Sequence, residues 1–370
     1  MGIWQSAMES LGMTAGLSQA QFWQDKKVFL TGHTGFKGGW LALWLNSMGA
    51  QVHGYALSPS TTPSFFNVAN LEGILVSNTI ADIRDAVTLE RAMAIAQPDI
   101  VFHLAAQPLV RQSYIDPVET FTTNVIGTVN LLEAVRKTTS ICAVVNVTTD
   151  KCYENKETLT PYSEDAPMGG FDPYSSSKGC SELVTSSYRQ SFLAGKGIAL
   201  ASARAGNVIG GGDWSVDRLI PDFLQALDKK EELVIRSPYA IRPWQHVLEP
   251  LSGYLQLAER LVTERQTFAQ AWNFGPAEKD AKTVEWIVKK LVEDLPNAKW
   301  RIDDSPQPHE AHYLKLDSTK ANTQLNWQPK WSLETALVNI MAWHQAWNNK
   351  EDMHQFSLGQ IANYQKAESI

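Results

Sequence analysis

Two residues that could remove a proton from an alcohol stand four positions apart, Tyr174 and Lys178. On a helix, side chains at this spacing lie on one face, a turn apart. An ammonium near a phenol favours the phenolate, so a tyrosine with an ordinary pKa of about 10 becomes a usable base nearer neutrality. The pair therefore predicts removal of an alcohol proton while hydride leaves the same carbon. A chain with ten tyrosines can contain this spacing by chance, so the neighbouring motifs must decide.

A glycine-rich turn near the N-terminus has the context of a dinucleotide site. An apolar strand expected over 26–31 leads into Gly32, Gly35 and Gly38, and an apolar helix follows around 40–48. Glycines let a pyrophosphate approach the backbone, and a helix N-terminus offers free N–H groups to its charge. We expect the whole turn to contact a cofactor, including the intervening residues His33, Thr34, Phe36 and Lys37. The alternative is a glycine-rich turn that binds no ligand.

The second strand, expected over 51–56, does not end in the Asp or Glu that usually contacts the adenine ribose of NAD. It ends in Leu57 and Ser58, and no arginine follows closely, so NADP stays open although we expect NAD. Asp82 follows the third strand, expected over 76–80, and Ile83 stands beside it. Asp82 is either an adenine contact or a cap for the next helix.

Two further strands carry candidate site residues at their carboxyl ends, the edge where ligands bind in a doubly wound sheet. The fourth, expected over 99–104, ends in Leu104 and the small residues Ala105 and Ala106. The fifth, expected over 141–147, leads into four polar residues: Thr148, Thr149, Asp150 and Lys151. A long loop over 154–173 follows, and we expect it to cover the substrate.

The order of elements predicts an α/β fold: a Rossmann-type doubly wound parallel sheet with a smaller mixed α/β substrate-binding lobe. We expect an N-terminal arm over 1–24, a dinucleotide-binding domain over 25–205 with later returns near 242–276, a lobe over 206–350 and a tail over 351–370. A helix expected over 117–137 has an apolar stripe that serves either the core or a dimer interface.

Composition excludes several classes of protein. The 370 residues carry a net charge of −7 and have no Lys/Arg-rich run, which argues against nucleic-acid binding. The three cysteines fall at no zinc-ligand or disulfide-framework spacing, so we expect a reduced, cytoplasmic protein with no metal site. Residues 1–21 lack the basic and apolar regions of a signal peptide, and no stretch approaches the length of a membrane helix.

The combination of motifs resembles the extended short-chain dehydrogenase/reductase superfamily over residues 25–350, and within it the CDP-D-glucose 4,6-dehydratases. The stretches that carry the resemblance are TGHTGFKGGWL (31–41), AAQPLVRQSY (105–114), VTTDKCYENKE (147–157), GGFDPYSSSKGCSE (169–182), RAGNVIGGGDW (204–214), IRPWQHVLEPL (241–251) and PHEAHYLKLD (308–317). The resemblance implies a bound nicotinamide dinucleotide, a nucleotide-sugar substrate such as CDP-glucose, a homodimer, and a role in deoxysugar and O-antigen biosynthesis.

The family pattern assigns roles to individual residues. It makes Tyr174 the base for oxidation at C4, with Lys178 as its electrostatic partner and a ligand of the nicotinamide ribose. Thr149 would bind the C4 oxygen, and Asp150 would protonate the departing C6 hydroxyl. Related dehydratases have Glu as the C5 base where this chain has Lys151, so the base at C5 stays open.

Other positions match binding residues. Besides the glycine turn, the expected cofactor contacts are Asp82, Ile83, Leu104, Ala105, Ala106, Asn124, Thr148, Tyr174 and Lys178. The expected substrate contacts are Gln107, Arg111, Thr149, Asn207, Arg218, Arg242, His312 and Tyr313. The competing hypotheses are a nucleotide-sugar 4-epimerase, which needs no acid for C6, and a non-catalytic dinucleotide sensor on the same fold.

Overall fold

A parallel sheet forms the centre of the molecule. The computed structural model describes residues 19–293, 295, 298–303, 305 and 313–370. Its seven-stranded sheet has the order β3-β2-β1-β4-β5-β6-β11. The strands are β1 (Lys27–Thr31), β2 (Gln51–Ala56), β3 (Ser77–Ile80), β4 (Ile100–His103), β5 (Ala143–Val147), β6 (Ala199–Ala205) and β11 (Ala271–Phe274). The strand order reverses between β1 and β4, which makes their carboxyl ends the expected place for a ligand.

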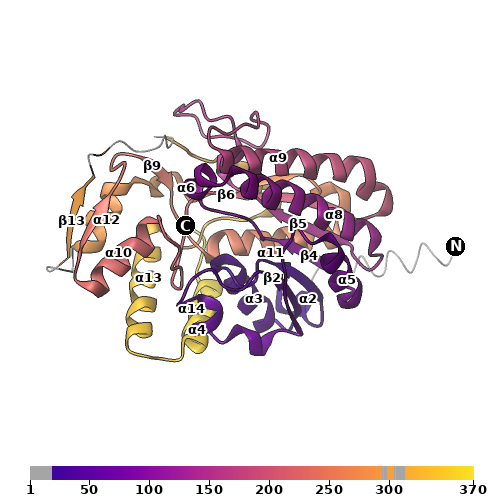
Figure 1. The fold of residues 1–370 in the computed structure, drawn as a ribbon, viewed down its shortest axis with the longest axis horizontal. Helices are drawn as coiled ribbons and strands as arrows, with labels where there is room; N and C mark the ends of the chain where they lie inside the picture. The colour runs from indigo at the N-terminus through magenta and orange to yellow at the C-terminus, as the bar shows by residue number, and fades with distance from the viewer. Residues whose placement is uncertain (1–18, 294, 296–297, 304, 306–312) are drawn as a thin grey trace.

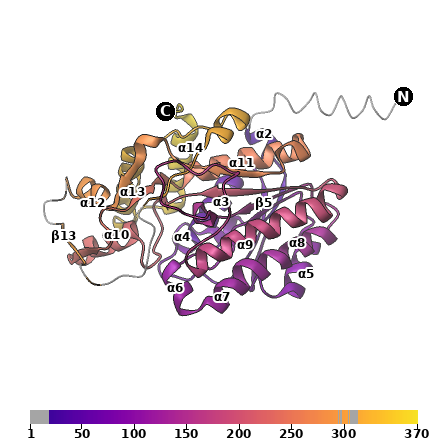
Figure 2. The same cartoon turned by 90° about the horizontal axis from the view of Figure 1, so that it is seen from above.

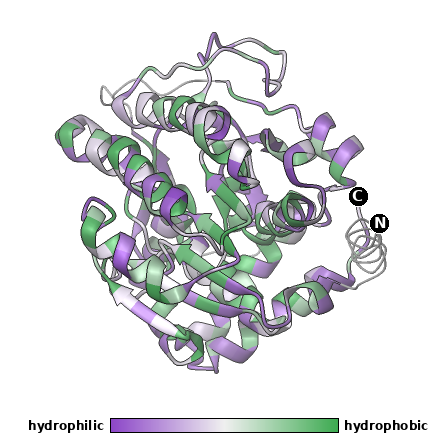
Figure 3. Cartoon of the chain, turned by 90° about the vertical axis from the view of Figure 1, so that its right-hand side faces the viewer, coloured by the Kyte–Doolittle hydropathy of each residue, from purple (hydrophilic) through white to green (hydrophobic). Residues whose placement is uncertain are grey.

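Helices cover both faces of this sheet (Figure 2). On one face lie α5 (Ala86–Ala96), α8 (Gly127–Lys137) and α9 (Pro173–Tyr188), and on the other lie α3 (Phe36–Ser47) and α11 (Leu248–Thr263). Side chains of β1 alternate between the two cores: Val28 and Leu30 pack with α3 and α11, and Phe29 packs with α5 and α8. Because both faces are covered, the strands are mostly hydrophobic (Figure 3).

A second lobe has its own core (Figure 1). It contains a parallel pair, β8 (Glu232–Ile235) and β13 (Lys299–Ile302), with helices α10 (Leu219–Lys229), α12 (Val284–Val292) and α13 (Leu333–Asn348). Two short pairs join it to the sheet domain: β7 (Val208–Ile209) with β10 (Gln245–His246), and β9 (Ile241–Pro243) with β12 (Ala281–Thr283). The chain returns to the first lobe at α11 and β11, where β11 pairs with β6.

The helix expected over 117–137 is divided by one wide turn. It consists of α7 (Pro117–Phe121), a π-helical turn over 122–126, and α8. Leu132 is buried in the core, whereas Val118 and Phe121 are exposed. Only part of the apolar stripe therefore packs in the core, and the other part faces the surface. None of the helices in the described residues is both long and apolar enough to span a membrane.

The expected tail over 351–370 is wrong. Residues Met353–Lys366 form helix α14, and its Tyr364 is 1% exposed and donates a hydrogen bond to Glu249 on α11 at 2.7 Å. Residues 19–23 of the expected arm also form a helix, α2, whose Trp23 donates to Glu259 at 2.7 Å. In each segment a buried aromatic side chain packs against the protein and donates a hydrogen bond to a carboxylate, which fixes the segment to the fold.

We predict that Tyr364→Phe lowers the free energy of unfolding by about 1–3 kcal/mol, because it removes a buried hydrogen bond to a carboxylate. Chemical denaturation measures the change. Tyr239→Phe is the control, since Tyr239 is 72% exposed, and its effect should stay within about 0.5 kcal/mol. Equal stability of the two variants would contradict the role of α14 as an integral part of the fold.

Candidate active site

A cavity of about 600 Å³ runs along the carboxyl edge of the sheet and continues between the lobes. It joins the ends of β1, β2, β4 and β5 to residues of the second lobe, so one ligand can contact both. Most residues expected at the site line it: Gly32, Thr34, Gly35, Phe36, Lys37, Gly38, Asp82, Ile83, Leu104, Ala105, Ala106, Gln107, Arg111, Thr148, Thr149, Asp150, Lys151, Tyr174, Lys178, Asn207, Arg218 and Arg242.

The glycine turn has the shape that a pyrophosphate requires. Gly32 has a φ of 77°, and a Cβ at Gly38 would lie 2.1 Å from the Gly32 carbonyl oxygen. Gly35 precedes α3 without any side-chain cap, so the positive end of the helix faces the cavity lining. A side chain at either Gly32 or Gly38 would displace backbone, so this turn fits a dinucleotide phosphate.

Two expected cofactor contacts lie outside the cavity lining. His33 is fully buried, with its Nε2 at 2.8 Å from Asn78 Oδ1, and burial lowers its pKa. Asn124 accepts from the Gln107 backbone N–H at 2.8 Å and donates to Ser177 at 2.8 Å. His33 therefore contacts Asn78, and Asn124 joins Gln107 to Ser177 on α9, while their predicted contact with a cofactor stays a prediction.

The edge next to β2 holds an ion pair. Asp82 lines the cavity and accepts two hydrogen bonds from Arg84 Nε at 3.0 Å, and the hydrogen bonds from Arg84 lower its pKa. The alternative role of Asp82 as a helix cap is wrong, because Asp85 caps α5 by accepting from the Thr88 backbone N–H.

Helix α9 places Tyr174 and Lys178 against the end of β5. Asp172 caps the helix by accepting from the Ser175 backbone N–H at 2.9 Å. Tyr174 and Lys178 are 8% and 7% exposed, and the Lys178 ammonium donates to the Val147 carbonyl at 3.3 Å. Burial lowers the pKa of Lys178 to about 8, although Glu182 and Cys152 act in the opposite direction.

The acidity of Tyr174 differs from the sequence-based expectation. Burial raises its pKa to about 12, and a hydrogen bond with Thr149 only partly offsets this. The reason is burial: desolvation of the phenolate outweighs the favourable effects of Thr149 and Arg218, and the charges of Asp150 and Asp172 add to the rise in pKa. The protein groups alone therefore do not make the phenol of Tyr174 more acidic than an ordinary tyrosine.

The turn after β5 supplies an acid. Residues Asp150–Cys152 form a 3₁₀ turn capped by Thr149, whose hydroxyl also donates to Asp150 Oδ1 at 3.0 Å. Asp150 is 1% exposed, burial raises its pKa, and its second oxygen has no partner among the described residues. An unpaired buried oxygen costs about 1–3 kcal/mol, which indicates a place for a substrate hydroxyl.

Lys37 has surroundings that the sequence did not indicate. Its ammonium lies 6.0 Å from the centre of the buried Tyr254 ring, inside the protein. Burial lowers its pKa to about 7, Arg218 and Lys178 act in the same direction, and Asp150 opposes them. Lys37 is therefore a second amine near Asp150 and Lys178, in addition to its place in the glycine turn.

Arginines gather at the second-lobe end of the cavity. Arg218 pairs with Asp213 at 3.6 Å, and Asp217 pairs with Arg236 at 2.9 Å and with Arg111 at 3.8 Å. Arg236 also lines the cavity. The sequence did not indicate it, because it lies in the segment between β8 and β9, which carries no recognisable motif. Several arginine side chains along one cavity suit a diphosphate, because guanidinium groups bind phosphate oxygens.

Tyr313 and the loop over 154–173 do not line the cavity. Tyr313 forms a bridge with Ile241, and its carbonyl accepts from Asn155 at 3.0 Å. The loop expected to cover the substrate contributes no described residue between 154 and 173 to the lining. His312 lies outside the described residues.

Comparisons with known proteins agree with this geometry. The family model described as GDP-mannose 4,6 dehydratase matches residues 29–340. A CDP-glucose 4,6-dehydratase from Salmonella typhimurium is 56% identical, and the match covers 94% of this chain and 98% of that one. A probable dTDP-glucose 4,6-dehydratase from Sinorhizobium fredii is 28% identical over 86% of this chain and 92% of its own.

Solved structures share the fold. A dTDP-glucose 4,6-dehydratase from Streptomyces venezuelae, solved with NAD bound, has a TM-score of 0.75 at 21% identity and covers 88% of this chain and 98% of its own. A UDP-glucose 4-epimerase from Thermotoga maritima has a TM-score of 0.73 at 23% identity, over 87% of this chain and 98% of its own. The fold and the glycine turn define a dinucleotide-binding α/β enzyme of the Rossmann type. The chain belongs to the GDP-mannose 4,6 dehydratase family.

We predict that Gly38→Ala abolishes dinucleotide binding, because its Cβ would lie 2.1 Å from the Gly32 carbonyl oxygen. Fluorescence titration with NAD and with NADP measures the loss and shows which of the two the wild-type protein prefers. Gly195→Ala is the matched control, since a Cβ there meets nothing within 4 Å. Unchanged NAD affinity in Gly38→Ala would exclude the glycine turn as the phosphate site.

Proposed function

We propose that this chain is an NAD-dependent lyase that converts CDP-D-glucose to CDP-4-keto-6-deoxy-D-glucose. The observation that carries the proposal is the buried Asp150, an acid with one oxygen without a partner among the described residues, in the same cavity as Tyr174 and Lys178. The 56% identity to a CDP-glucose 4,6-dehydratase over nearly the whole chain supports the choice of substrate. The glycine turn fits the cofactor.

The first step is oxidation at C4 of the glucose. Tyr174 takes the proton of the C4 hydroxyl, and Thr149, which is bonded to Tyr174, holds the C4 oxygen. Bound NAD supplies the chemistry of accepting a hydride from C4 and returning it to C6, and its positive charge favours the phenolate. Lys178 keeps an ammonium close to the reacting oxygen.

The second step is loss of water across C5 and C6. A hexose does not lose water readily, but once C4 is a ketone, the C5 proton lies next to a carbonyl and becomes acidic. Because burial raises the pKa of Asp150, its carboxyl can carry a proton to the departing C6 hydroxyl. We assign removal of the C5 proton to Lys151, which lines the cavity beside Asp150.

The site separates this reaction from its nearest alternative. A 4-epimerase shares the fold, as the Thermotoga maritima structure illustrates, and also needs a base and a hydride acceptor. It needs no acid at C6, and the buried Asp150 would then be an unexplained cost. A non-catalytic sensor would need neither Asp150 nor the tyrosine and lysine pair.

The nucleotide lies toward the second lobe. We assign the diphosphate to Arg218 and Arg242, with Asn207, because all three line the cavity and the two arginines supply positive charge. Their charges would neutralise the two phosphates and leave the sugar at Tyr174.

Incubation of the protein with CDP-glucose and NAD tests the function directly. The expected product is a 4-keto-6-deoxy sugar, detected by its alkaline absorbance and by mass spectrometry as a loss of water. Appearance of the C4 epimer would establish the epimerase, and recovery of unchanged substrate with NAD bound would establish the sensor.

We predict that Asp150→Asn permits oxidation but stalls elimination, because the amide cannot deliver the proton. Rapid mixing should show reduced cofactor accumulating at 340 nm, with overall turnover lower by about 10²–10⁴-fold. Tyr174→Phe is the comparison, since it should lose turnover by a similar factor without accumulating reduced cofactor. Equal failure of oxidation in both variants would give Asp150 a different role.

We predict that Lys151→Met abolishes exchange of the C5 hydrogen with heavy water while C4 oxidation stays detectable. Mass spectrometry of the product made in heavy water measures the exchange. Lys151→Arg should retain much of the activity only if a permanent cation suffices. Exchange that persists in Lys151→Met would redirect the assignment to Lys37, the other amine beside Asp150.

We also propose a homodimer that forms through α7 and α9. Val118 on α7 is 70% exposed and Leu183 on α9 is 60% exposed, and the two helices lie side by side (Figure 2). An apolar surface of this kind is typical of an interface. Light scattering should show a dimer that Leu183→Asp dissociates and Val87→Asp, on the far helix α5, does not.

We place the reaction in the cytoplasm and the product in deoxysugar synthesis for surface polysaccharides such as O-antigen. The three cysteines, Cys142, Cys152 and Cys180, are unpaired, as a reducing compartment allows.

A further inference from the structure

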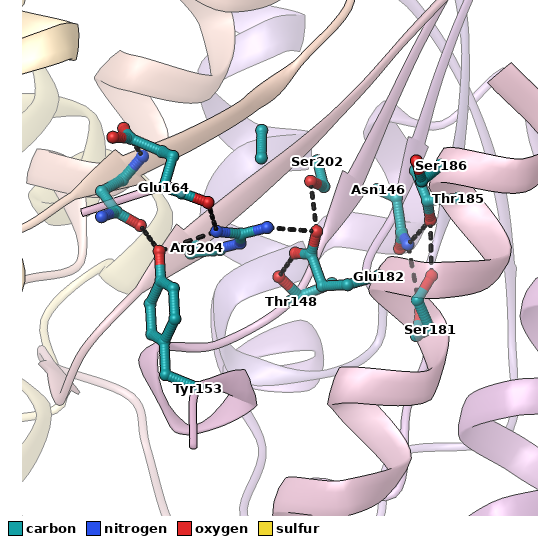
Figure 4. A network of polar contacts seen from close by, with 12 residues as sticks. Asn146, Thr148, Tyr153, Glu164, Ser181, Glu182, Thr185, Ser186, Ser202 and Arg204 are labelled. Carbon is teal, nitrogen blue, oxygen red and sulfur yellow. Dashed lines mark hydrogen bonds and ion pairs between the residues drawn. The ribbon is translucent and has the colours of Figure 1, made fainter. Parts of the chain in front are cut away.

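A buried ion pair lies behind the active site (Figure 4). Glu182 and Arg204 are 5% and 4% exposed, and their charged atoms lie 2.8 Å apart. Glu182 also accepts hydrogen bonds from Thr148 at 2.5 Å and from Ser202 at 2.6 Å. It stands on α9 four residues after Lys178 and eight after Tyr174, so the three side chains share one side of the helix.

Arg204 extends the network to a second part of the chain. It donates to the Tyr153 hydroxyl at 2.7 Å, and that hydroxyl donates to Asn273 on β11 at 2.6 Å. Thr148 immediately precedes Thr149, and Tyr153 immediately follows Cys152. The network therefore holds both ends of the turn 149–152, which carries the elimination residues of the proposed function.

Stability alone does not account for this arrangement. Burial of two charges costs several kcal/mol per ion, and apolar residues of similar volume often replace such a pair without loss of stability. Burial disfavours the charged form of both side chains. The attraction between them outweighs this effect, so the pKa of Glu182 is lowered and that of Arg204 is raised. A network of this kind specifies one geometry.

The carboxylate also acts on Lys178. The titratable groups that face Lys178 come from four elements: Glu182 on α9, Cys152 on the turn, His103 on β4 and Lys37 on α3. His103 is buried with a pKa lowered to about 3 and so is neutral, and burial raises the pKa of the Cys152 thiol. Glu182 is thus the anion in this set that keeps Lys178 protonated.

We propose that Glu182 and Arg204 are positioning residues for the reaction, a unit that holds the turn 149–152 at both ends in register with Tyr174 and Lys178 on α9. The unit couples the oxidation pair to the elimination residues, so that both steps act on one bound sugar. This inference rests on the proposed function for the identity of the two steps.

Glu182→Gln tests the first half of the unit. It keeps the shape and removes the charge, so Lys178 loses the group that raises its pKa, and its ammonium is lost at lower pH. The alkaline limb of kcat/KM should move to lower pH by about one unit, and kcat should fall about a hundredfold. Thr185→Val is the matched control: Thr185 is buried on the same helix and accepts from Asn146 at 2.7 Å, so its loss removes a buried bond without changing charge near Lys178.

An unmoved alkaline limb in Glu182→Gln, with the control also unmoved, would overturn the proposal. If this variant does not fold because Arg204 is left unpaired, the double variant Glu182→Gln, Arg204→Gln removes both charges. A smaller shift in the same direction is expected, because the loss of the Arg204 charge offsets part of the loss of the Glu182 charge, and an unmoved limb has the same consequence.

Tyr153→Phe tests the second half. It retains the ring, which stacks on Tyr162 with centroids 5.4 Å apart, and removes the hydroxyl that joins Arg204 to Asn273. Elimination should slow about tenfold more than C4 oxidation, and the alkaline limb should stay in place. Hydrogen–deuterium exchange, which needs no substrate, should accelerate over 148–156 and not over α10. Equal slowing of both steps with unchanged exchange would show that the network does not hold the turn.

The wild-type assay separates the two claims. If CDP-glucose gives no 4-keto-6-deoxy product, the proposed function fails, whereas the exchange measurement on Tyr153→Phe still reports on the turn. If the product forms but neither variant behaves as expected, only the positioning role fails.

Discussion

The close approach of helix α9 to the turn that follows strand β5 is the constraint on which the site depends. A Cβ at Gly179, next to Lys178, would lie 3.3 Å from the Cys152 carbonyl oxygen of that turn and 2.7 Å from the Gly169 carbonyl oxygen of the loop before α9. Only glycine permits this distance between helix and loop. The approach places a base on a helix beside an acid on a turn, although 24 residues separate Asp150 from Tyr174.

That proximity has an electrostatic consequence. The cavity lining includes Lys37, Lys151, Lys178, Arg218 and Arg242, all facing a region where Asp150 is buried. Desolvation lowers the pKa of the buried amines Lys37 and Lys178 and raises that of Asp150. The pKa values of these groups therefore move toward neutral pH. Groups in this state exchange protons readily at physiological pH, as a reaction with several proton transfers requires.

The solved structures with this fold carry out different reactions, so the fold alone does not determine the activity. A dTDP-glucose 4,6-dehydratase and a UDP-glucose 4-epimerase resemble this chain to nearly the same degree, with TM-scores of 0.75 and 0.73. The fold is compatible with either activity, so the choice between them must come from the residues of the site. The buried ion pair of Glu182 and Arg204 contacts Thr148 and Tyr153, which flank the turn 149–152.

The sequence by itself determined the sheet, the glycine turn and the polar residues that the candidate site is built from. Strands such as 27–31 and 100–103 are short, mostly apolar runs bounded by turn residues, and their alternation with helical segments predicts the parallel fold. A strand that is buried on both faces has apolar residues at most successive positions, so the sequence alone can predict it.

Only the tertiary structure decided which polar residues reach the cavity. His33 and Asn124 lie in the predicted segments, but their side chains form hydrogen bonds within the protein, and Arg236 lines the cavity from the segment that follows β8. The C-terminal helix and the raised pKa of Tyr174 were also beyond prediction. Each depends on side-chain direction and desolvation, which are set by contacts between residues far apart in the chain, and sequence spacing does not contain that information.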